Sequence, residues 1–301
     1  MDTLNGFHSA VLSGRDTPKA VDMVCGWLEQ QRAARPPEQW QLLCREVREH
    51  PLASVLHTEP FTARGLKKPR GYAGDAVTMD MIYGMGGSPH PLRSEIRALH
   101  SAVMQRPAMR GARWRRQTIR EHIDNLARQR PGVRIASLAA GHLREIEDSI
   151  AVRNGAVATY WALDQDEESL VTVSRAYGKY GVQSAPEHVR DVIARGGLKQ
   201  APLDMITSTG LYDYLPDRTA IRLTRALLGS LAPGGRLLVA NVTPQFGDAG
   251  YFEAVMDWTL IHRDAHAMLA LLGHPTPPEL DDVRLFQDPD GGILFLSASR
   301  R

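Results

Sequence analysis

Cysteine is scarce in this sequence, since Cys25 and Cys44 are the only two among 301 residues. Neither has a C-x-x-C partner or a histidine at the spacing of a zinc site, so we expect no metal centre and no disulfide framework. Both cysteines fall in helix-like patterns. We expect them to be buried, reduced core residues.

Long apolar runs are also absent. No stretch approaches the roughly eighteen uncharged apolar residues that a membrane span needs, and no apolar region of a secretory signal follows the polar start of the chain. We therefore expect a cytoplasmic protein without a membrane partner. Aromatic residues make up only 6% of the chain and do not interleave with the basic ones, so no nucleic-acid partner is expected.

Charge is unevenly distributed along the chain. The formal net charge is +2, yet residues 1–130 carry 20 Lys and Arg against 13 Asp and Glu, and the remainder carries 16 against 21. A basic front fits a small acidic substrate, and an arginine-rich solvated helical surface explains it about equally well. The oligomeric state stays open, with a homodimer as one option.

The hydrophobic periodicity changes near residue 130. Before it, apolar residues recur at helical spacing, and a long helix over residues 109–130 ends at Pro131-Gly132. We therefore predict an all-helical cap or substrate-binding region over 1–130. A second domain is predicted over 131–301.

Strand-like and helix-like segments alternate in this second region, which indicates a parallel sheet covered on both faces. The last two strand-like segments, D-V-R-L-F-Q and G-I-L-F-L-S-A, are joined only by D-P-D-G-G and must pair as an antiparallel hairpin. The fold class predicted is α/β, a Rossmann-like sheet with a C-terminal antiparallel hairpin, an arrangement that resembles that of class I methyltransferases.

The most informative stretch is V-R-I-A-S-L-A-A-G-H-L-R-E-I, from Val133 to Ile146, which has the pattern of a buried strand, a glycine turn and a helix start. Such a turn presents backbone N–H groups to a nucleotide-like ligand. Asp164 ends the next strand-like run, 23 residues after Gly141, where an acid can hold a ribose. Only one glycine stands where a dinucleotide fingerprint has three, which favours S-adenosylmethionine over NAD because the former has no pyrophosphate.

Other polar residues fall at the predicted carboxyl ends of the strands. His142 and Arg144 are placed in the first turn of the following helix, Asp166 is a candidate helix cap, and Asp191 is a candidate adenine ligand, with His188 and Val189 as alternatives. The predicted cofactor-binding residues are Ala139, Ala140, Gly141, His142, Asp164, Gln165, Asp191, Ser208, Thr209, Gly210 and Leu211.

Three further patches are candidates for the substrate site. The segment K-P-R-G-Y-A-G-D-A has the polar, glycine-flanked composition of a binding loop, two tyrosines follow the fourth strand, and a predicted helix after the fifth carries Trp258, His262 and Arg263 on one side. Packing of these aromatic residues in the core is the structural alternative. The predicted substrate-binding residues are Arg70, Tyr72, Asp75, Tyr212, Tyr214, Trp258, His262 and Arg263.

The strings S-L-A-A-G-H-L-R-E-I-E, A-L-D-Q-D-E-E-S-L, S-T-G-L-Y-D-Y-L and K-P-R-G-Y-A-G-D-A resemble bacterial S-adenosylmethionine-dependent methyltransferases. More narrowly, they are similar to the family that includes the synthases of 3-hydroxy fatty acid methyl esters used as quorum signals. The resemblance runs from about Phe61 to the C-terminus. It implies that Gly141, Asp164 and Ser208 to Leu211 bind the cofactor and that Arg70, Tyr72 and Asp75 close over it. The chain departs from the wider pattern at Ala139 and Leu143, where glycines are usual, and at Ser137, where an acid is common.

The leading hypothesis is methyl transfer from S-adenosylmethionine to an oxygen, favoured as a carboxylate, of a small acidic biosynthetic metabolite. Tyr72, Tyr212 and His142 are the catalytic candidates. The nearest alternative is an N-methyltransferase acting on an amine or an amino-acid-derived molecule, with His142, His262 or Asp75 as base. More distant alternatives are a nicotinamide-dependent oxidoreductase and a non-catalytic nucleotide-binding protein.

Overall fold

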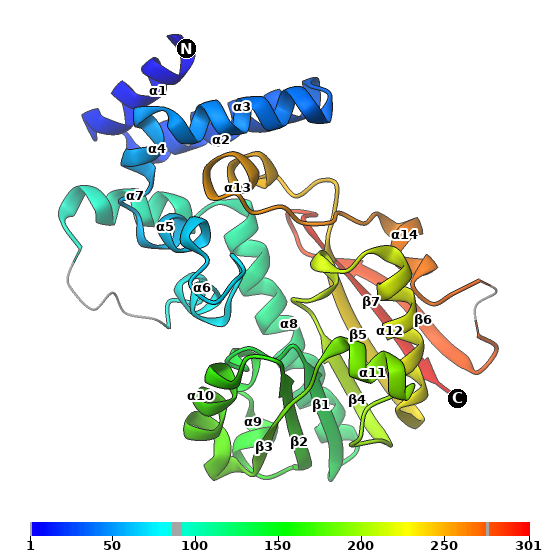
Figure 1. Ribbon diagram of the computed structural model, residues 1–301. Coiled ribbons are helices and arrows are strands. Elements are labelled where there is room, and N and C mark those ends of the chain that lie inside the picture. Colours follow the sequence, from blue (N-terminus) through cyan, green and yellow to red (C-terminus); the bar gives the residue numbers. More distant parts are fainter. Residues whose placement is uncertain (1, 86–91, 275–276) are drawn as a thin grey trace. The chain divides into compact units, whose positions relative to one another are not determined.

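The computed structural model describes residues 2–85, 92–274 and 277–301 (Figure 1). The chain forms two compact units, one comprising Met1–Arg113 with Phe246–Leu260 and the other Trp114–Gln245 with Ile261–Arg301. The first division thus falls inside helix α8 (Pro107–Gln129), whereas the sequence analysis expected a boundary at residue 130. Pro131-Gly132 does end the helix, but Ile119, Ile123 and Ala127 already pack in the core of the second unit.

The first unit is helical. Proline lies in the first turn of several of its helices, where its missing N–H is not needed, and the side chain of Asp16 caps α2 by accepting the Lys19 N–H at 3.1 Å. The helices of this unit, besides the start of α8, are α1 (Asp2–Ser13), α2 (Thr17–Ala34), α3 (Pro37–Glu49), α4 (Pro51–Leu56), α5 (Pro60–Lys67), α6 (Ala76–Ile82), α7 (Ser94–Met104) and α13 (Ala249–Met256).

Helix α13 comes from the second half of the sequence, which the sequence analysis assigned to the second domain as a whole. Its Glu253 carboxylate accepts the Trp40 indole N–H at 2.6 Å, and Asp248 accepts from Arg106 at 2.7 Å. A Cβ added at Gly250 would lie 2.7 Å from the Leu28 backbone, so only glycine allows this approach. These side chains explain why the segment belongs to the helical unit.

The second unit contains a sheet in which, within the described residues, seven strands run in the order β3-β2-β1-β4-β5-β7-β6 (Figure 1). All pairs are parallel except those of β7, which is antiparallel to both β5 and β6. The strands are β1 (Val133–Leu138), β2 (Val157–Asp164), β3 (Val182–Pro186), β4 (Leu203–Ser208), β5 (Leu231–Val242), β6 (Leu280–Gln287) and β7 (Ile293–Arg300). The predicted α/β class and its terminal hairpin are confirmed.

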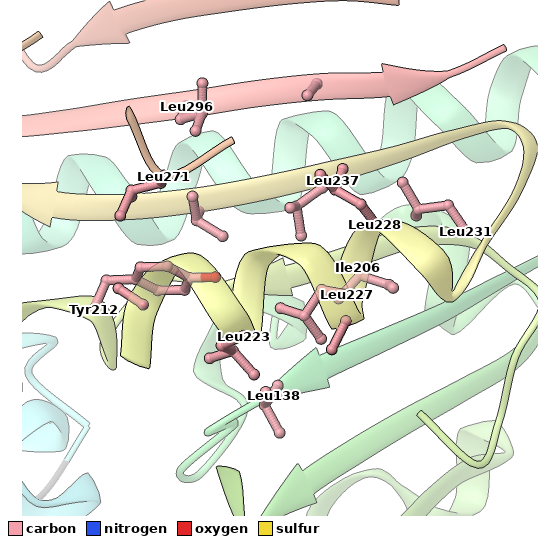
Figure 2. Packing of buried hydrophobic residues seen from close by; sticks show 14 of the residues in the cluster. Leu138, Ile206, Tyr212, Leu223, Leu227, Leu228, Leu231, Leu237, Leu271 and Leu296 are labelled. Atoms are coloured by element: carbon pink, nitrogen blue, oxygen red, sulfur yellow. The ribbon is translucent and has the colours of Figure 1, made fainter. Parts of the chain in front are cut away.

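Helices cover both faces of this sheet. Residues of β1 alternate between them: Val133 and Ile135 pack against α8, and Ala136 and Leu138 pack on the opposite face. Figure 2 shows the core on the face of Ala136 and Leu138, in which leucines of α12 pack against leucines of β5 and β7. The helices involved, besides α8, are α9 (Ile150–Arg153), α10 (Glu167–Tyr177), α11 (Val189–Arg195), α12 (Asp217–Gly229) and α14 (Ala265–Ala270). Among the described residues, no helix is both long and apolar enough to cross a membrane.

Candidate functional site

The strand order places one topological switch point in the sheet. The chain runs outward from β1 to β2 and β3, then crosses back to β4 on the other side of β1. Connections leave the carboxyl ends of β1 and β4 in opposite directions, and ligands bind at this position in sheets of this kind. The turn after β1, the end of β2 and the loop after β4 therefore define the candidate site.

The turn after β1 has an unusual backbone. Ala139, Gly141 and Leu143 all have left-handed φ angles, of 55°, 52° and 52°. Glycine adopts this conformation at little cost, whereas alanine and leucine do so under strain. The predicted helix start at His142 is wrong. The left-handed residues prevent a helix from beginning there, and a short 3-10 helix, η1 (Arg144–Ile146), follows instead. His142 is buried beside this turn.

Asp164, at the end of β2, ties this turn to the neighbouring strand. Its Oδ2 accepts the Gly141 N–H at 2.7 Å and its Oδ1 accepts the Asp166 N–H at 2.9 Å. Burial raises the pKa of Asp164, and the backbone N–H donors oppose that rise. Gln165 is exposed, and Asp166 caps α10 as predicted by accepting the Glu168 N–H. The sequence-predicted Gly141 and Asp164 are therefore in direct contact.

The prediction for Asp191 as an adenine ligand is not supported by its position. Strand β3 ends at Pro186, and Asp191 is an exposed residue in the first turn of α11 beside Arg190. Glu187 directly follows β3, is buried, and pairs with Arg195 at 2.8 Å. Its backbone N–H also donates to the Asp164 carbonyl. Glu187 was not predicted from the sequence because the short strand before it gives a weak pattern.

The loop after β4 begins at Ser208, whose side chain is 1% exposed. Within the described parts of the chain, its hydroxyl oxygen has no hydrogen-bond partner, which is uncommon for a buried polar atom. Arg115 of α8 donates to the Thr209 carbonyl at 2.8 Å. Gly210 is exposed and Leu211 is half-buried.

Tyr212 does not line this edge, and its prediction as a substrate or catalytic residue is corrected. It is fully buried in η3 (Tyr212–Tyr214) and its hydroxyl lies 2.9 Å from Thr224 Oγ1 of α12. Figure 2 shows its ring alongside α12 within the apolar core. Tyr214 is only half-buried and stays a predicted substrate contact.

Replacing Tyr212 with phenylalanine tests this structural assignment. The change removes one buried hydrogen bond, so we expect Tyr212→Phe to lower the free energy of unfolding by about 1 kcal/mol and to leave cofactor affinity and turnover unchanged. Thermal unfolding and steady-state kinetics measure the two effects. A large loss of turnover in a folded protein would return Tyr212 to the site.

The predicted helix carrying Trp258, His262 and Arg263 is also corrected. Helix α13 ends at Met256, and Asp257 has a left-handed φ of 50° that stops it. Trp258 stacks on Phe252 within the first unit, with ring centroids 4.7 Å apart, whereas His262 and Arg263 belong to the second unit. Arg263 is only 1% exposed and is bonded to protein groups, so it is not a substrate ligand. His262 is half-buried and stays a prediction.

The segment Arg70–Asp75 lies in the first unit between α5 and α6. Asp75 is fully buried, where it caps α6 by accepting the Thr78 N–H and pairs with Arg64 at 2.6 Å. These contacts assign Asp75 a structural role instead of that of a base or substrate ligand. Arg70 and Tyr72 are both half-buried and stay predictions.

Two acidic residues near the carboxyl edge were not predicted as site residues. Burial raises the pKa of Asp213 to about 6, against the opposing effects of the Val242 N–H and the charges of Arg115 and Arg263. Burial also raises the pKa of Glu145, and the charges of Arg115 and Arg116 and a hydrogen bond with Ser137 oppose that rise. Ser137 Oγ in turn lies 2.9 Å from Tyr160 Oη and 2.7 Å from Thr207 Oγ1. Perturbed acids of this kind gather at functional sites, and both residues lay within strings already of interest, Glu145 in S-L-A-A-G-H-L-R-E-I-E and Asp213 in S-T-G-L-Y-D-Y-L.

Substitution of Ala139 tests the strained turn. Because a β-branched side chain fits a left-handed backbone poorly, Ala139→Val is expected to cost about 2 kcal/mol or more of stability. Ala139→Gly removes the strain but adds unfolded-state entropy, so its stability is expected within about 1 kcal/mol of the parent. Chemical denaturation compares the two variants. Equal stability of the valine and glycine variants would contradict the left-handed assignment.

Comparisons with known proteins agree with this architecture. No protein-family model matches the chain, and no curated protein matches its sequence. Among solved structures, a possible exported protein from Bordetella parapertussis matches with a TM-score of 0.62 and 18% identity, covering 99% of this chain and 96% of that one. Magnesium protoporphyrin IX methyltransferase (ChlM) from Synechocystis PCC 6803, with S-adenosylhomocysteine (SAH) bound, has a TM-score of 0.51 and 12% identity, covering 74% of this chain and 92% of that one. At these identities the likeness establishes a Rossmann-like fold of the methyltransferase type.

Proposed function

We propose that this protein is a cytoplasmic S-adenosylmethionine-dependent methyltransferase that methylates an oxygen of a small acidic biosynthetic metabolite. The observation that carries the proposal is the hydrogen bond from the Gly141 N–H, in the left-handed turn, to the Asp164 carboxylate, beside the switch point of the sheet. The SAH-bound structure of ChlM, which has a similar fold, supports the same cofactor.

The residues at the carboxyl edge fit this cofactor. Both carboxylate oxygens of Asp164 accept backbone N–H groups, and a carboxylate has about four acceptor sites, so Asp164 retains capacity to accept a hydroxyl of a ribose. The buried Ser208 hydroxyl offers a donor and acceptor to a polar group above β4. We assign cofactor contacts to residues 139–142, Asp164, Glu187 and 208–211. We assign substrate binding to the first unit, in place of the predicted residues 1–130.

Methyl transfer requires little acid–base chemistry when the acceptor is a carboxylate. S-adenosylmethionine, when bound, supplies an electrophilic methyl group. A carboxylate acceptor is already ionised near neutral pH, so the protein has to align the acceptor oxygen with the methyl carbon and exclude water. In the second unit, the buried His142 is our candidate for the side chain that guides the acceptor oxygen to the methyl carbon.

The acidic acceptor is proposed from charge and from sequence resemblance. Since Arg263 is engaged within the fold, Arg70 is the remaining candidate to hold an anionic group, with Tyr72 beside it. The resemblance to synthases of 3-hydroxy fatty acid methyl esters favours hydroxy acids as acceptors, and N-methylation of an amine is the alternative.

Mass spectrometry with methyl-labelled cofactor tests the reaction. The protein is incubated with separate pools of hydroxy acids, amino acids and amines, and we expect one labelled methyl group on a hydroxy acid, released by mild base as expected for an ester. A label stable to base on an amine would support the N-methylating alternative. Absence of transfer to every pool by a protein that binds the cofactor would reject the acidic acceptor.

A further inference from the structure

Arg263 lies in the second unit shortly after the chain re-enters it at Ile261. Its guanidinium is 1% exposed and uses all five of its N–H donors. Nη1 donates to the Tyr212 carbonyl and Asn241 Oδ1, each at 2.7 Å, while Nη2 donates to the Leu215 carbonyl at 2.5 Å and Asp217 Oδ1 at 2.7 Å. Nε also donates to Asp217 Oδ1 at 3.1 Å.

These contacts join three segments. The carbonyls of Tyr212 and Leu215 belong to the loop that continues directly from Ser208, Asn241 lies at the end of β5, and Asp217 begins α12. Because the planar fork of an arginine fixes the direction of each bond, the guanidinium sets where the loop carbonyls lie.

Asp213 reinforces the same junction. Its Oδ1 accepts the Val242 N–H at 2.7 Å, its carbonyl accepts the Ile261 N–H at 2.7 Å, and the Arg263 N–H donates to the Val242 carbonyl at 2.9 Å. The loop after β4 is thus held to β5 and to the returning chain between Tyr212 and Leu215.

We propose that Arg263 is a positioning residue for cofactor binding, which holds the loop from Ser208 to Leu215 in its binding shape through the Tyr212 and Leu215 carbonyls. This inference rests on the proposed function, since it assigns a role in the same cofactor site. Arg263 itself contacts no cofactor in this account. Without Arg263 the loop is less ordered before binding. The entropy lost when the cofactor orders it then lowers the affinity.

The test uses the full chain with Arg263→Ala and Arg263→Lys, and SAH as the probe. Titration calorimetry is expected to show SAH binding at least about tenfold weaker in both variants, because lysine cannot reproduce the forked contacts. Millimolar methylguanidinium is expected to restore affinity to Arg263→Ala. Hydrogen exchange of the cofactor-free protein is expected to rise over 208–215 and to stay unchanged over α11. If Arg263→Ala does not fold, Arg263→Lys carries both measurements.

Arg134→Ala is the matched control, since Arg134 also donates to a backbone carbonyl, that of Gln200, at 2.9 Å, but lies at the amino end of β1. We expect its SAH affinity to equal that of the parent. Parental affinity and exchange in folded Arg263 variants would overturn the inference, and so would unrescued loss of binding with increased exchange throughout the second unit. If the parent protein binds no SAH, the proposed function fails, and the exchange measurement alone still decides whether Arg263 orders the loop.

Discussion

Asp164→Ala is expected to weaken SAH binding at least about 100-fold while the protein stays folded. The substitution removes a buried carboxylate that can accept a ribose hydroxyl, and hydrogen bonds to charged groups contribute about 1.5–3 kcal/mol each. It also releases the Gly141 and Asp166 N–H groups, so the turn after β1 loses its anchor. Titration calorimetry measures the affinity, and circular dichroism checks that the fold is retained.

Asp166→Ala is the matched control for this prediction. The neighbouring carboxylate caps α10 and bonds to Glu168 and Ser169, so its loss is expected to cost about 1 kcal/mol of stability and to change SAH affinity less than about threefold. Equal loss of affinity in the two variants would mean that Asp164 acts through general destabilisation of this edge.

Asp213→Asn is expected to stabilise the protein at pH 8 by on the order of 2–3 kcal/mol. Burial raises the pKa of Asp213 to about 6 from an ordinary value near 3.9, so its ionised form is disfavoured in the folded state by about 1.4 kcal/mol per pH unit of that difference. The destabilisation of the parent is complete above the folded pKa and disappears below the unfolded one. The advantage of asparagine should therefore shrink as the pH falls through 6, and be small at pH 4.

Thermal unfolding of the parent and Asp213→Asn at pH 5 and pH 8 measures this dependence, with a difference of several degrees expected at pH 8. Asp281→Asn, at an exposed position of β6, is expected to change stability by less than about 0.5 kcal/mol at either pH. An advantage of Asp213→Asn that is equal at both values would contradict the buried, ionised carboxylate.

The sheet could be predicted because its strands carry strong local signals. The later part of the apolar run V-A-T-Y-W-A-L is buried on both faces, with Tyr160 and Ala162 in one core and Leu163 in the other. The short D-P-D-G-G connection permits only an antiparallel pairing of β6 with β7. Asp164 was found for the same reason, since it directly follows a clear strand. β3 has only five residues, and its weak pattern left its end undefined, so the buried Glu187 that directly follows it was not selected.

The turn after β1 could not be predicted because its conformation contradicts local preference. Ala139 and Leu143 occupy left-handed positions that normally favour glycine, and surrounding contacts compensate: Leu143 is fully buried and Gly141 is held by Asp164. The sequence departs from the glycine pattern at these two positions, whereas the backbone keeps the conformation that glycine would allow.

Burial of polar side chains was the other limit. Tyr212 and Arg263 have residue types common in binding sites, and their position near a sheet edge is compatible with either exposure or burial. Their partners, Thr224 and the carbonyls of 212 and 215, are set by tertiary packing and do not appear in any local pattern. The assignment of Phe246–Leu260 to the helical unit depends on long-range contacts of the same kind.

Titration calorimetry of the parent protein with SAH, S-adenosylmethionine and NAD tests the central claim most directly. The left-handed turn, Asp164 and the buried Ser208 hydroxyl predict binding of both sulfur-containing nucleosides with dissociation constants on the order of micromolar, and no saturable binding of NAD. Saturation by NAD without binding of S-adenosylmethionine or SAH would contradict the account.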